Sequence, residues 1–239
     1  LEFRDRNALA AGDTTPTGQT LAASAGLRAC LDALRPAWRA ANAAAAAFNA
    51  STAGKRRGAG IACMWYGIGN TVIANPSSMR GALCWSASRG AHLMLYNGAQ
   101  EIGQGTATIM PQMFADAVGL PLACVRQVIG DTDLTADAGK SSASRQTFVS
   151  GNAARAAGLA LRRELLARLD LADADDADVR LSLEGHALVA TSATGAAERR
   201  VDVRDWQADA AGDLASASGH FNPPTVPLDA DGQGVPYAT

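Results

Sequence analysis

Two short segments each precede a stretch with helical periodicity: Gln100-Glu101-Ile102-Gly103-Gln104-Gly105-Thr106 and Gly139-Lys140-Ser141-Ser142-Ala143-Ser144-Arg145-Gln146. Each segment is a turn of small residues that leads directly into a predicted helix. The first turn of a helix carries backbone N–H groups without intrahelical partners, and such groups bind anions. We therefore expect both segments to present N–H groups and neutral side chains to one polar ligand, such as a phosphate-bearing cofactor.

Periodic patterns around the two turns predict a compact lobe over residues 58–170. The expected strands cover residues 59–66, 81–88, 91–96 and 123–129, and the expected helices cover residues 105–118 and 144–169. If the strands that precede the two turns belong to one sheet, both helix starts lie at the same edge of that sheet. The predicted fold class is therefore α+β, a mixed sheet with helices packed on it, as part of a cofactor-binding lobe.

A connector and helical segment, residues 1–57, is expected before this lobe. Residues 1–23 have few periodic apolar positions and read as an extended connector. A helix should follow over residues 24–49, where apolar residues recur at helical spacing and alanine is frequent. Pro36 should kink this helix or split it in two.

A peripheral region, residues 171–239, is expected after the lobe. An acidic stretch at residues 170–178 comes first. A hairpin formed by residues 179–183 and 187–190 comes after it. Residues 209–239 are rich in Gly, Pro, Ser and Asp. We expect this last part to wrap across its neighbours without forming a core.

Composition argues against two classes of function. The chain has 239 residues, 48% of them apolar, and a formal net charge of −2 without the long basic block that nucleic-acid backbones require. No apolar run approaches the roughly 20 residues of a membrane-spanning helix. We expect no nucleic-acid partner, no membrane insertion and a cytoplasmic location, or a periplasmic one if the protein is exported with a partner.

The cysteines lie far apart in the sequence. Cys30, Cys63, Cys84 and Cys124 form no Cys-x-x-Cys pair, so their spacing does not fit zinc or iron–sulfur ligands within this chain. We predict four free thiols that are buried as small apolar side chains. No metal-ligand set is predicted.

The first turn has the chemistry of a heterocycle-binding turn. Gly103 and Gly105 lack side chains, so a planar ring can approach the backbone, and Gln104 offers one acceptor and two donors. Thr106 can cap the helix or meet a ligand oxygen. The alternative is a simple turn from strand to helix, in which Gln104 is structural. Glu101 has the chemistry of a general base, but a carboxylate among helix N-termini is more typical of a cap.

The second turn places three serine hydroxyls at a helix start. Ser141, Ser142 and Ser144 can donate hydrogen bonds to a pyrophosphate, with Arg145 and Gln146 on the first helical turn. The alternative is a helix cap, for which one serine is sufficient. No catalytic residue is predicted. The candidate cofactor-binding residues are Gly103, Gln104, Gly105, Thr106, Ser141, Ser142, Ser144, Arg145 and Gln146.

In order and spacing, the two segments resemble the molybdopterin-binding subunit of the xanthine dehydrogenase and aldehyde oxidoreductase (molybdenum hydroxylase) family, and most of all its bacterial aldehyde oxidoreductase branch. In that family a Glu-x-Gly-Gln-Gly stretch and a Ser-rich Ser-Arg-Gln stretch contact the pterin. The resemblance covers almost the whole chain. It extends to Leu1-Glu2-Phe3-Arg4, Gly12-Asp13-Thr14, Pro16-Thr17-Gly18-Gln19, residues 58–69, Gly130-Asp131-Thr132, Ser150-Gly151-Asn152-Ala153, Gly219-His220-Phe221-Asn222-Pro223-Pro224 and Gly234-Val235-Pro236-Tyr237.

The resemblance implies an oxidoreductase that oxidises aldehydes or hydroxylates heteroaromatic rings with a molybdopterin cofactor and molybdenum. It also implies the cytosine dinucleotide form of the cofactor, and iron–sulfur clusters of the 2Fe-2S type outside this chain. The implied partners are the remainder of the molybdenum subunit and iron–sulfur and FAD domains or subunits. The substrate is not implied, because the residues that select it lie outside the two turns.

Departures from the family pattern limit what the chain can do. The family's Gly-Gly-x-Phe-Gly segment and its Gly-Val-Gly-Glu segment, which supplies the catalytic glutamate, do not occur in these residues. We therefore expect a cofactor-binding fragment that is inactive by itself. Two alternatives remain: a non-catalytic scaffold or interaction domain that keeps the fold, and an unrelated phosphate- or nucleotide-binding domain. The serine cluster opposes the first, and the absence of a Gly-x-x-x-x-Gly-Lys-Ser/Thr loop opposes the second.

Overall fold

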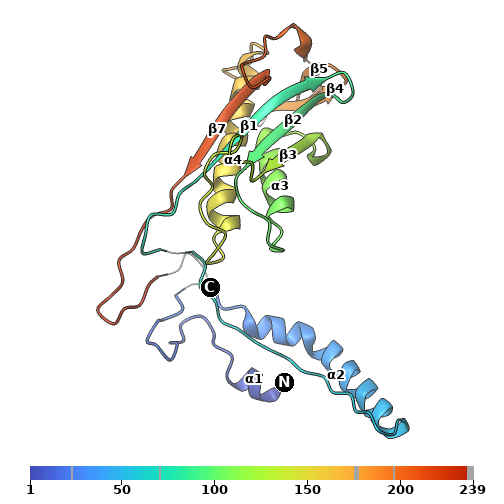
Figure 1. The fold of residues 1–239 in the computed structure, drawn as a ribbon, viewed down its shortest axis with the longest axis vertical. Coiled ribbons are helices and arrows are strands. Elements are labelled where there is room, and N and C mark those ends of the chain that lie inside the picture. The colour runs from blue at the N-terminus through green and yellow to red at the C-terminus, as the bar shows by residue number, and fades with distance from the viewer. Residues whose placement is uncertain (23, 70, 175–177, 196, 236–239) are drawn as a thin grey trace. The chain divides into compact units, whose positions relative to one another are not determined.

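The computed structural model describes residues 1–22, 24–69, 71–174, 178–195 and 197–235 (Figure 1). Contacts divide the chain into two compact units, Leu1–Val72 with Val226–Thr239, and Ile73–Thr225. The sequence analysis places its boundaries elsewhere, at residues 57 and 170. Residues 175–177 of the acidic stretch, and Pro236 and Tyr237 of the last resembling segment, lie outside the described residues. Both candidate turns belong to the second unit.

A four-stranded sheet of strand order β3-β2-β1-β7 forms the centre of the second unit. Strands β1 (Ser77–Ser86) and β2 (Gly90–Asn97) form an antiparallel hairpin, as the sequence predicts. Strand β3 (Val125–Ile129), which follows a 3-10 turn at Leu122–Cys124, pairs with β2 in parallel. Strand β7 (Ala215–Phe221) pairs with β1 antiparallel. The sheet is therefore mixed, and the predicted α+β class is confirmed.

Two helices, α3 (Thr106–Val118) and α4 (Gln146–Ala167), pack against each other and against this sheet. A side chain at Gly81 of β1 would overlap the ring of Phe114 on α3. Gly219 of β7 lies so close to α4 that a Cβ atom would overlap the carbonyl oxygen of Ala153. These close approaches bury one apolar core between the sheet and the helices. Its members include Met79, Leu83, Leu93, Leu95, Phe114 and Leu161.

A second, antiparallel sheet has the strand order β4-β5-β6. It consists of β4 (Val179–Glu184), β5 (Ala187–Ser192) and β6 (Glu198–Asp202), and a 3-10 turn follows at Val203–Asp205. The hairpin of β4 and β5 lies where the sequence predicts it. Its turn contacts the start of β2, where the Ala91 N–H donates to the Gly185 carbonyl at 2.6 Å.

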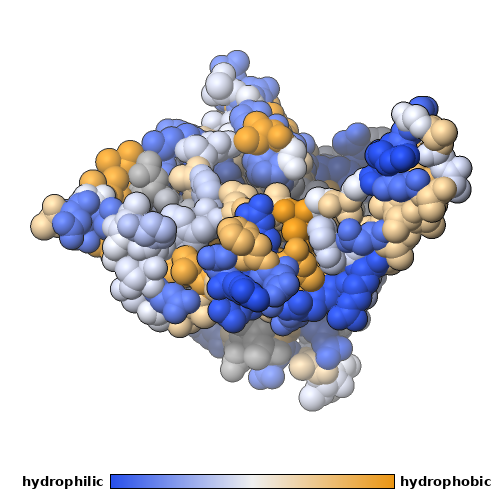
Figure 2. All heavy atoms as spheres, turned by 90° about the horizontal axis from the view of Figure 1, so that it is seen from below, coloured by the Kyte–Doolittle hydropathy of each residue, from blue (hydrophilic) through white to orange (hydrophobic). Residues whose placement is uncertain are grey.

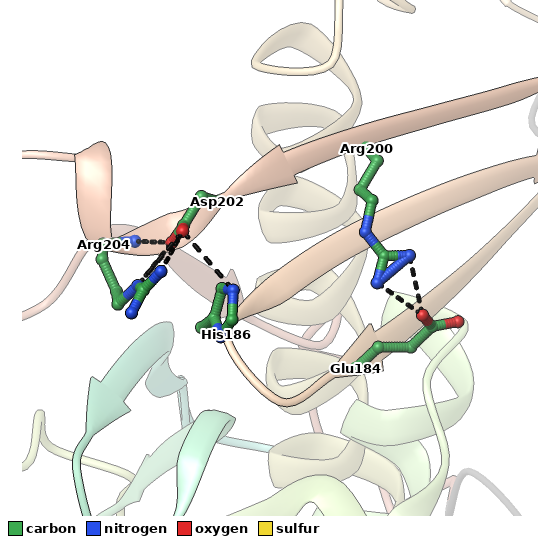
Figure 3. A network of polar contacts seen from close by, with 5 residues as sticks. All are labelled: Glu184, His186, Arg200, Asp202 and Arg204. Atoms are coloured by element: carbon green, nitrogen blue, oxygen red, sulfur yellow. Dashed lines mark hydrogen bonds and ion pairs between the residues drawn. The ribbon is translucent and has the colours of Figure 1, made fainter.

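Ion pairs on the smaller sheet lie on its exposed surface (Figure 3). Arg200 pairs with Glu184 at 2.7 Å, and Arg204 pairs with Asp202 at 2.5 Å. The hydrogen bond from Arg204 lowers the pKa of Asp202 to about 2. His186 lies 3.5 Å from the same carboxylate. Because exposed ion pairs contribute little to stability, we expect this network to add little to the stability of the sheet.

The first unit contains a short helix α1 (Glu2–Arg6) and a long helix α2 (Leu27–Ser51). Pro36 lies inside α2, which continues past it as one helix, so the predicted split is wrong. The alanine-rich sequence after Pro36 has high helix propensity and compensates for the hydrogen bond that proline cannot donate. In the described part of the chain, no helix combines the length and apolar character needed to cross a bilayer.

Three further predictions differ from the structure. Residues 59–66 belong to no assigned strand. Residues 209–239 do contribute to the core, because they include β7, whose small residues allow close packing on α4. The four cysteines are free, as predicted, but Cys30 is exposed and the other three are only partly buried. Hydrophobicity alone did not distinguish core positions from partly covered ones.

Candidate functional site

The carboxylate of Glu101 closes the loop between β2 and α3. Its Oε1 accepts hydrogen bonds from the N–H groups of Gly103 (2.7 Å) and Gly105 (3.0 Å), and its Oε2 accepts one from Ala107 (2.8 Å). Gly103 and Gly105 have φ values of 102° and 90°, which favour glycine. The hydrogen bonds, with that from Ala107 the largest effect, lower the pKa of Glu101. The structure confirms the interpretation of Glu101 as a cap of α3.

This cap decides which helix start can receive an anion. The Glu101 carboxylate lies at the positive end of the α3 dipole, where it would repel a second negative charge. The Ala107 N–H at the start of α3 is therefore already bonded, so the anion-binding expectation falls on the start of α4. Helix α4 has no side-chain cap, so its first turn is the end that suits an anion.

The side-chain amide of Gln104 is exposed but already has partners within the turn. Its Oε1 accepts from the Ile102 N–H (2.7 Å), and its Nε2 donates to the Gln100 carbonyl (2.8 Å) and to Thr106 Oγ1 (2.7 Å). Both amide hydrogens are therefore used, and Oε1 keeps one lone pair. Thr106 is 2% exposed, so its hydroxyl serves the turn. Gln104 therefore supports its own turn, and its remaining Oε1 lone pair is available to a ligand in the cavity that it lines.

Arg145 holds the second turn from inside the protein. Its side chain is fully buried. Nη1 donates to the carbonyls of Ala138 (3.0 Å) and Lys140 (2.9 Å). Nη2 donates to the carbonyls of Asn75 (2.9 Å) and Pro76 (3.1 Å). The guanidinium therefore ties the serine-rich turn to the chain just before β1.

Gln146 supports the same turn from the first residue of α4. Its Nε2 donates to Ser141 Oγ (2.9 Å) and to the Lys140 carbonyl (3.3 Å), and its Oε1 accepts a hydrogen bond from Ser150. The sequence analysis places the side chains of Arg145 and Gln146 at the ligand. In the structure these side chains bind protein atoms instead, because the turn folds back over them.

Ser142 and Ser144 are the serines of this turn whose hydroxyls remain available. Both are exposed, and among the described residues neither hydroxyl has a hydrogen-bond partner. Neither serine caps α4, so the predicted alternative of a serine cap is not observed. Ala143 and Ser144 have φ values of 56° and 51°, in the left-handed region that residues other than glycine seldom adopt. Strain of this kind is concentrated at ligand sites and switches.

The two turns line one cavity of about 330 Å³. A hydrogen bond from Ser141 Oγ to the Gln100 carbonyl (3.2 Å) joins them. None of the lining residues carries a carboxylate, and α4 begins at the cavity, so its surface suits a ligand with a negative charge. The lining residues are Ile102, Gln104, Ser141, Ser142, Ser144, Arg145, Gln146 and Thr147.

The remaining candidates shape the cavity without lining it. Gly103, Gly105 and Thr106 form the turn behind Gln104 and are not among the described lining residues. The sequence analysis missed Ile102 and Thr147. A large apolar side chain in a polar turn, 72% exposed in the case of Ile102, is the signal that could have found the first. In the chain as described, no group of three His, Cys, Asp or Glu side chains is arranged to hold a metal.

Comparison with known sequences identifies the family. A family model described as a molybdopterin cofactor-binding domain matches residues 33–239. The xanthine dehydrogenase molybdenum-binding subunit of Escherichia coli O157:H7 is 34% identical over 168 residues, which are 70% of this chain and 22% of that subunit. The chain thus spans about a fifth of the length of this relative.

Solved structures of two aldehyde oxidoreductases share the fold. The enzyme of Desulfovibrio gigas has a TM-score of 0.60 at 24% identity, and that of Desulfovibrio desulfuricans has a TM-score of 0.59 at 22% identity. Each match covers 99% of this chain and 22% of the longer one. The family match also includes both turns that line the cavity. The chain therefore belongs to the molybdopterin cofactor-binding domain family, and it is similar to a xanthine dehydrogenase molybdenum-binding subunit.

Proposed function

We propose that the cavity at the starts of α3 and α4 binds the molybdopterin cofactor of a molybdenum hydroxylase. The observation that carries the proposal is the pair of unbonded hydroxyls, those of Ser142 and Ser144, at the uncapped start of α4. They lie in a cavity that Gln104 of the other turn also lines. A purely structural turn has no need of two hydroxyls without partners.

The donor groups fit a ligand with one charged end and one neutral end. The hydroxyls of Ser142 and Ser144, with the first-turn N–H groups of α4, suit phosphate oxygens. The bare backbone of Gly103 and Gly105, with the remaining lone pair of Gln104 Oε1, suits the polar edge of a pterin. Two hydroxyls beside several N–H groups supply enough donors for a pyrophosphate, which favours the cytosine dinucleotide form.

The other candidate residues act on this ligand through the turns. Arg145 and Gln146 hold the serine-rich turn, Thr106 anchors Gln104, and Ser141 joins the two turns. Their substitution should therefore reduce cofactor binding together with stability. Substitution of Ser142 or Ser144, in contrast, should reduce cofactor binding without reducing the stability of the protein.

When bound, the cofactor supplies the redox chemistry of molybdenum, and this chain supplies binding and orientation. Glu101, the carboxylate nearest the turn in sequence, is engaged as a cap and is unsuited to act as a base. We therefore propose that the chain is inactive by itself and acts within a larger cytoplasmic subunit that oxidises aldehydes or heteroaromatic rings. Partner domains or subunits with 2Fe-2S clusters and FAD would carry the electrons away.

Cofactor content of the full-length subunit tests this proposal. A charge-assisted hydrogen bond contributes about 1.5–3 kcal/mol, so each of Ser142→Ala and Ser144→Ala should weaken cofactor affinity by about 10- to 150-fold. The pterin and molybdenum contents of the purified double variant should therefore fall below those of the parent. Ser88→Ala, at an exposed serine in the β1–β2 turn, is the matched control.

Two results would count against the proposal. Unchanged pterin content in the double variant would remove the serines from the site. Oxidation of aldehydes by the purified 239-residue chain with an artificial electron acceptor would show that the chain is not inactive by itself.

A further inference from the structure

Residues 58–69 of the first unit have a backbone to which no described residue offers a hydrogen-bond partner. The segment follows a double contact with α2, in which Asn49 Oδ1 accepts from the Arg57 N–H (2.8 Å) and Asn49 Nδ2 donates to the Arg57 carbonyl (2.9 Å). From there it runs beside α2 (Figure 1). Among the described residues, none forms a hydrogen bond with any atom of residues 58–69. Unpaired N–H and C=O groups along an extended segment are a template for pairing with another strand.

The segment has the pattern of a β-strand. Ala59, Ile61 and Cys63 are partly buried, whereas the intervening Gly60 and Ala62 are exposed. This period of two is the alternation of a strand with one face against its own unit. The sequence itself predicts a strand over residues 59–66. Over residues 59–63 the local preference and the local exposure therefore agree, and no described residue supplies the pairing.

Large apolar side chains follow in the same segment. Met64, Trp65 and Tyr66 are 75%, 47% and 48% exposed. Together with Cys63, and with Cys30 of α2, they line an apolar cavity of about 490 Å³. Figure 2 shows apolar residues interleaved with hydrophilic ones on the face seen from below. Adjacent exposed apolar side chains indicate a surface that another element covers.

We infer that residues 58–69 form a strand of a sheet that is completed by a partner strand from the remainder of the molybdenum-binding subunit. This inference rests on the proposed function, in which the chain acts within a larger subunit. The matched aldehyde oxidoreductase chains are long enough to supply such a strand, since this chain covers 22% of each. A strand is the partner that fits, because it offers donors and acceptors at every second residue.

Hydrogen exchange compares the full-length subunit with the 239-residue chain. In the isolated chain, the amides of residues 59–66 should exchange at the rate of an open backbone. In the full-length subunit, the paired amides should exchange at least about 100-fold more slowly. Fast exchange in both samples overturns the inference. Slow exchange in the isolated chain that disappears on dilution also overturns it, because a second copy of the chain is then the partner.

A pair of proline substitutions tests the edge at which the partner lies. Neighbouring residues of a strand direct their N–H groups to opposite edges. A single partner strand therefore bonds the amide of Ile61 or that of Ala62, but not both. In the full-length subunit, one of Ile61→Pro and Ala62→Pro should abolish the protection of residues 59–66, and the other should preserve it. Equal effects of the two substitutions overturn the inference.

The isolated chain is the control for both substitutions. Neither amide has a partner among the residues that the structure describes, so both variants should keep the parent's melting temperature. Pterin and molybdenum contents of the same full-length samples separate this inference from the proposed function. Fast exchange in a subunit that holds the cofactor contradicts the inferred strand pairing and leaves the proposed function standing. Slow exchange in a subunit without the cofactor contradicts the proposed function and leaves the inferred strand pairing standing.

Discussion

Arg145→Met removes the guanidinium that holds the serine-rich turn and keeps an unbranched apolar side chain in its place. The Lys140 carbonyl keeps a second donor, Gln146 Nε2, after this change, and the Ala138 carbonyl keeps a long contact (3.4 Å) with Ser150 Oγ, whose one proton is shared with Gln146 Oε1. The carbonyls of Asn75 and Pro76 have no other donor in the described chain. Asn75 is buried, whereas Pro76 is exposed and water can replace its lost donor. An unsatisfied buried polar group costs about 1–3 kcal/mol, so the free energy of unfolding should fall by about 1–3 kcal/mol. At about 2–4 °C per kcal/mol, the melting temperature should fall by at least about 2 °C.

Urea unfolding followed by circular dichroism measures this loss, and Ser142→Ala is the matched control from the same turn. The Ser142 hydroxyl is exposed and unbonded, so its removal should change the free energy of unfolding by less than about 0.5 kcal/mol. Arg145→Lys keeps the charge but cannot reach all four carbonyls, and it should lie between the two. If Arg145→Met costs no more than Ser142→Ala, the guanidinium does not hold the turn and the assignment of structural and binding roles is refuted.

Glu101 makes the α3 turn sensitive to acid: because its folded pKa is lowered, the stability that it contributes is present above its unfolded value near 4.5 and is lost as the pH falls through the folded value. An NMR titration of the Ala107 amide should show a transition below that pH, and Glu101→Gln should remove it. Gly219→Ala places a Cβ against the α4 backbone and should lower the free energy of unfolding by about 1–3 kcal/mol or more in urea, whereas a null effect would mean that β7 can move away. Burial raises the pKa of the Cys84 thiol to about 12, so a thiol reagent at about pH 8 should modify the exposed Cys30 and leave Cys84 unmodified; rapid labelling of both would contradict the packing of β1.

Local chemistry explains what could be predicted from the sequence. Residues 105–118 and 144–169 were predicted as helices, and α3 and α4 lie within those ranges. Gly119, with a φ of 79°, ends α3 as expected for a glycine in this position. The hairpins also follow from alternation and turn residues close in sequence. The bond from Ser141 to the Gln100 carbonyl bears out the expectation that the two turns meet.

The roles of individual side chains were less predictable. By sequence, Gln104 and Ser144 are both candidate cofactor ligands, and a structural turn and a helix cap are their alternative roles. In the structure Gln104 is bonded within its turn, and Ser144 caps nothing. Both residues have several chemically equivalent partners within reach, and only the backbone path of the turn selects among them. A short motif therefore identifies a site before it identifies which of its atoms face the ligand.

The sequence by itself determined the three longer helices, the main hairpins, the two turns and, through their order, the family, but not the short helix α1, which lies in the expected extended connector. Tertiary structure alone decided that Arg145 bonds the carbonyl of Asn75, 70 residues away, and that β7 joins the sheet beside β1. Helix periodicity and turn chemistry depend on residues a few positions apart, so they can be read along the chain. A buried hydrogen bond or an added strand depends on which distant segments pack together, because the free energy that selects it comes from desolvation and close packing in the assembled core.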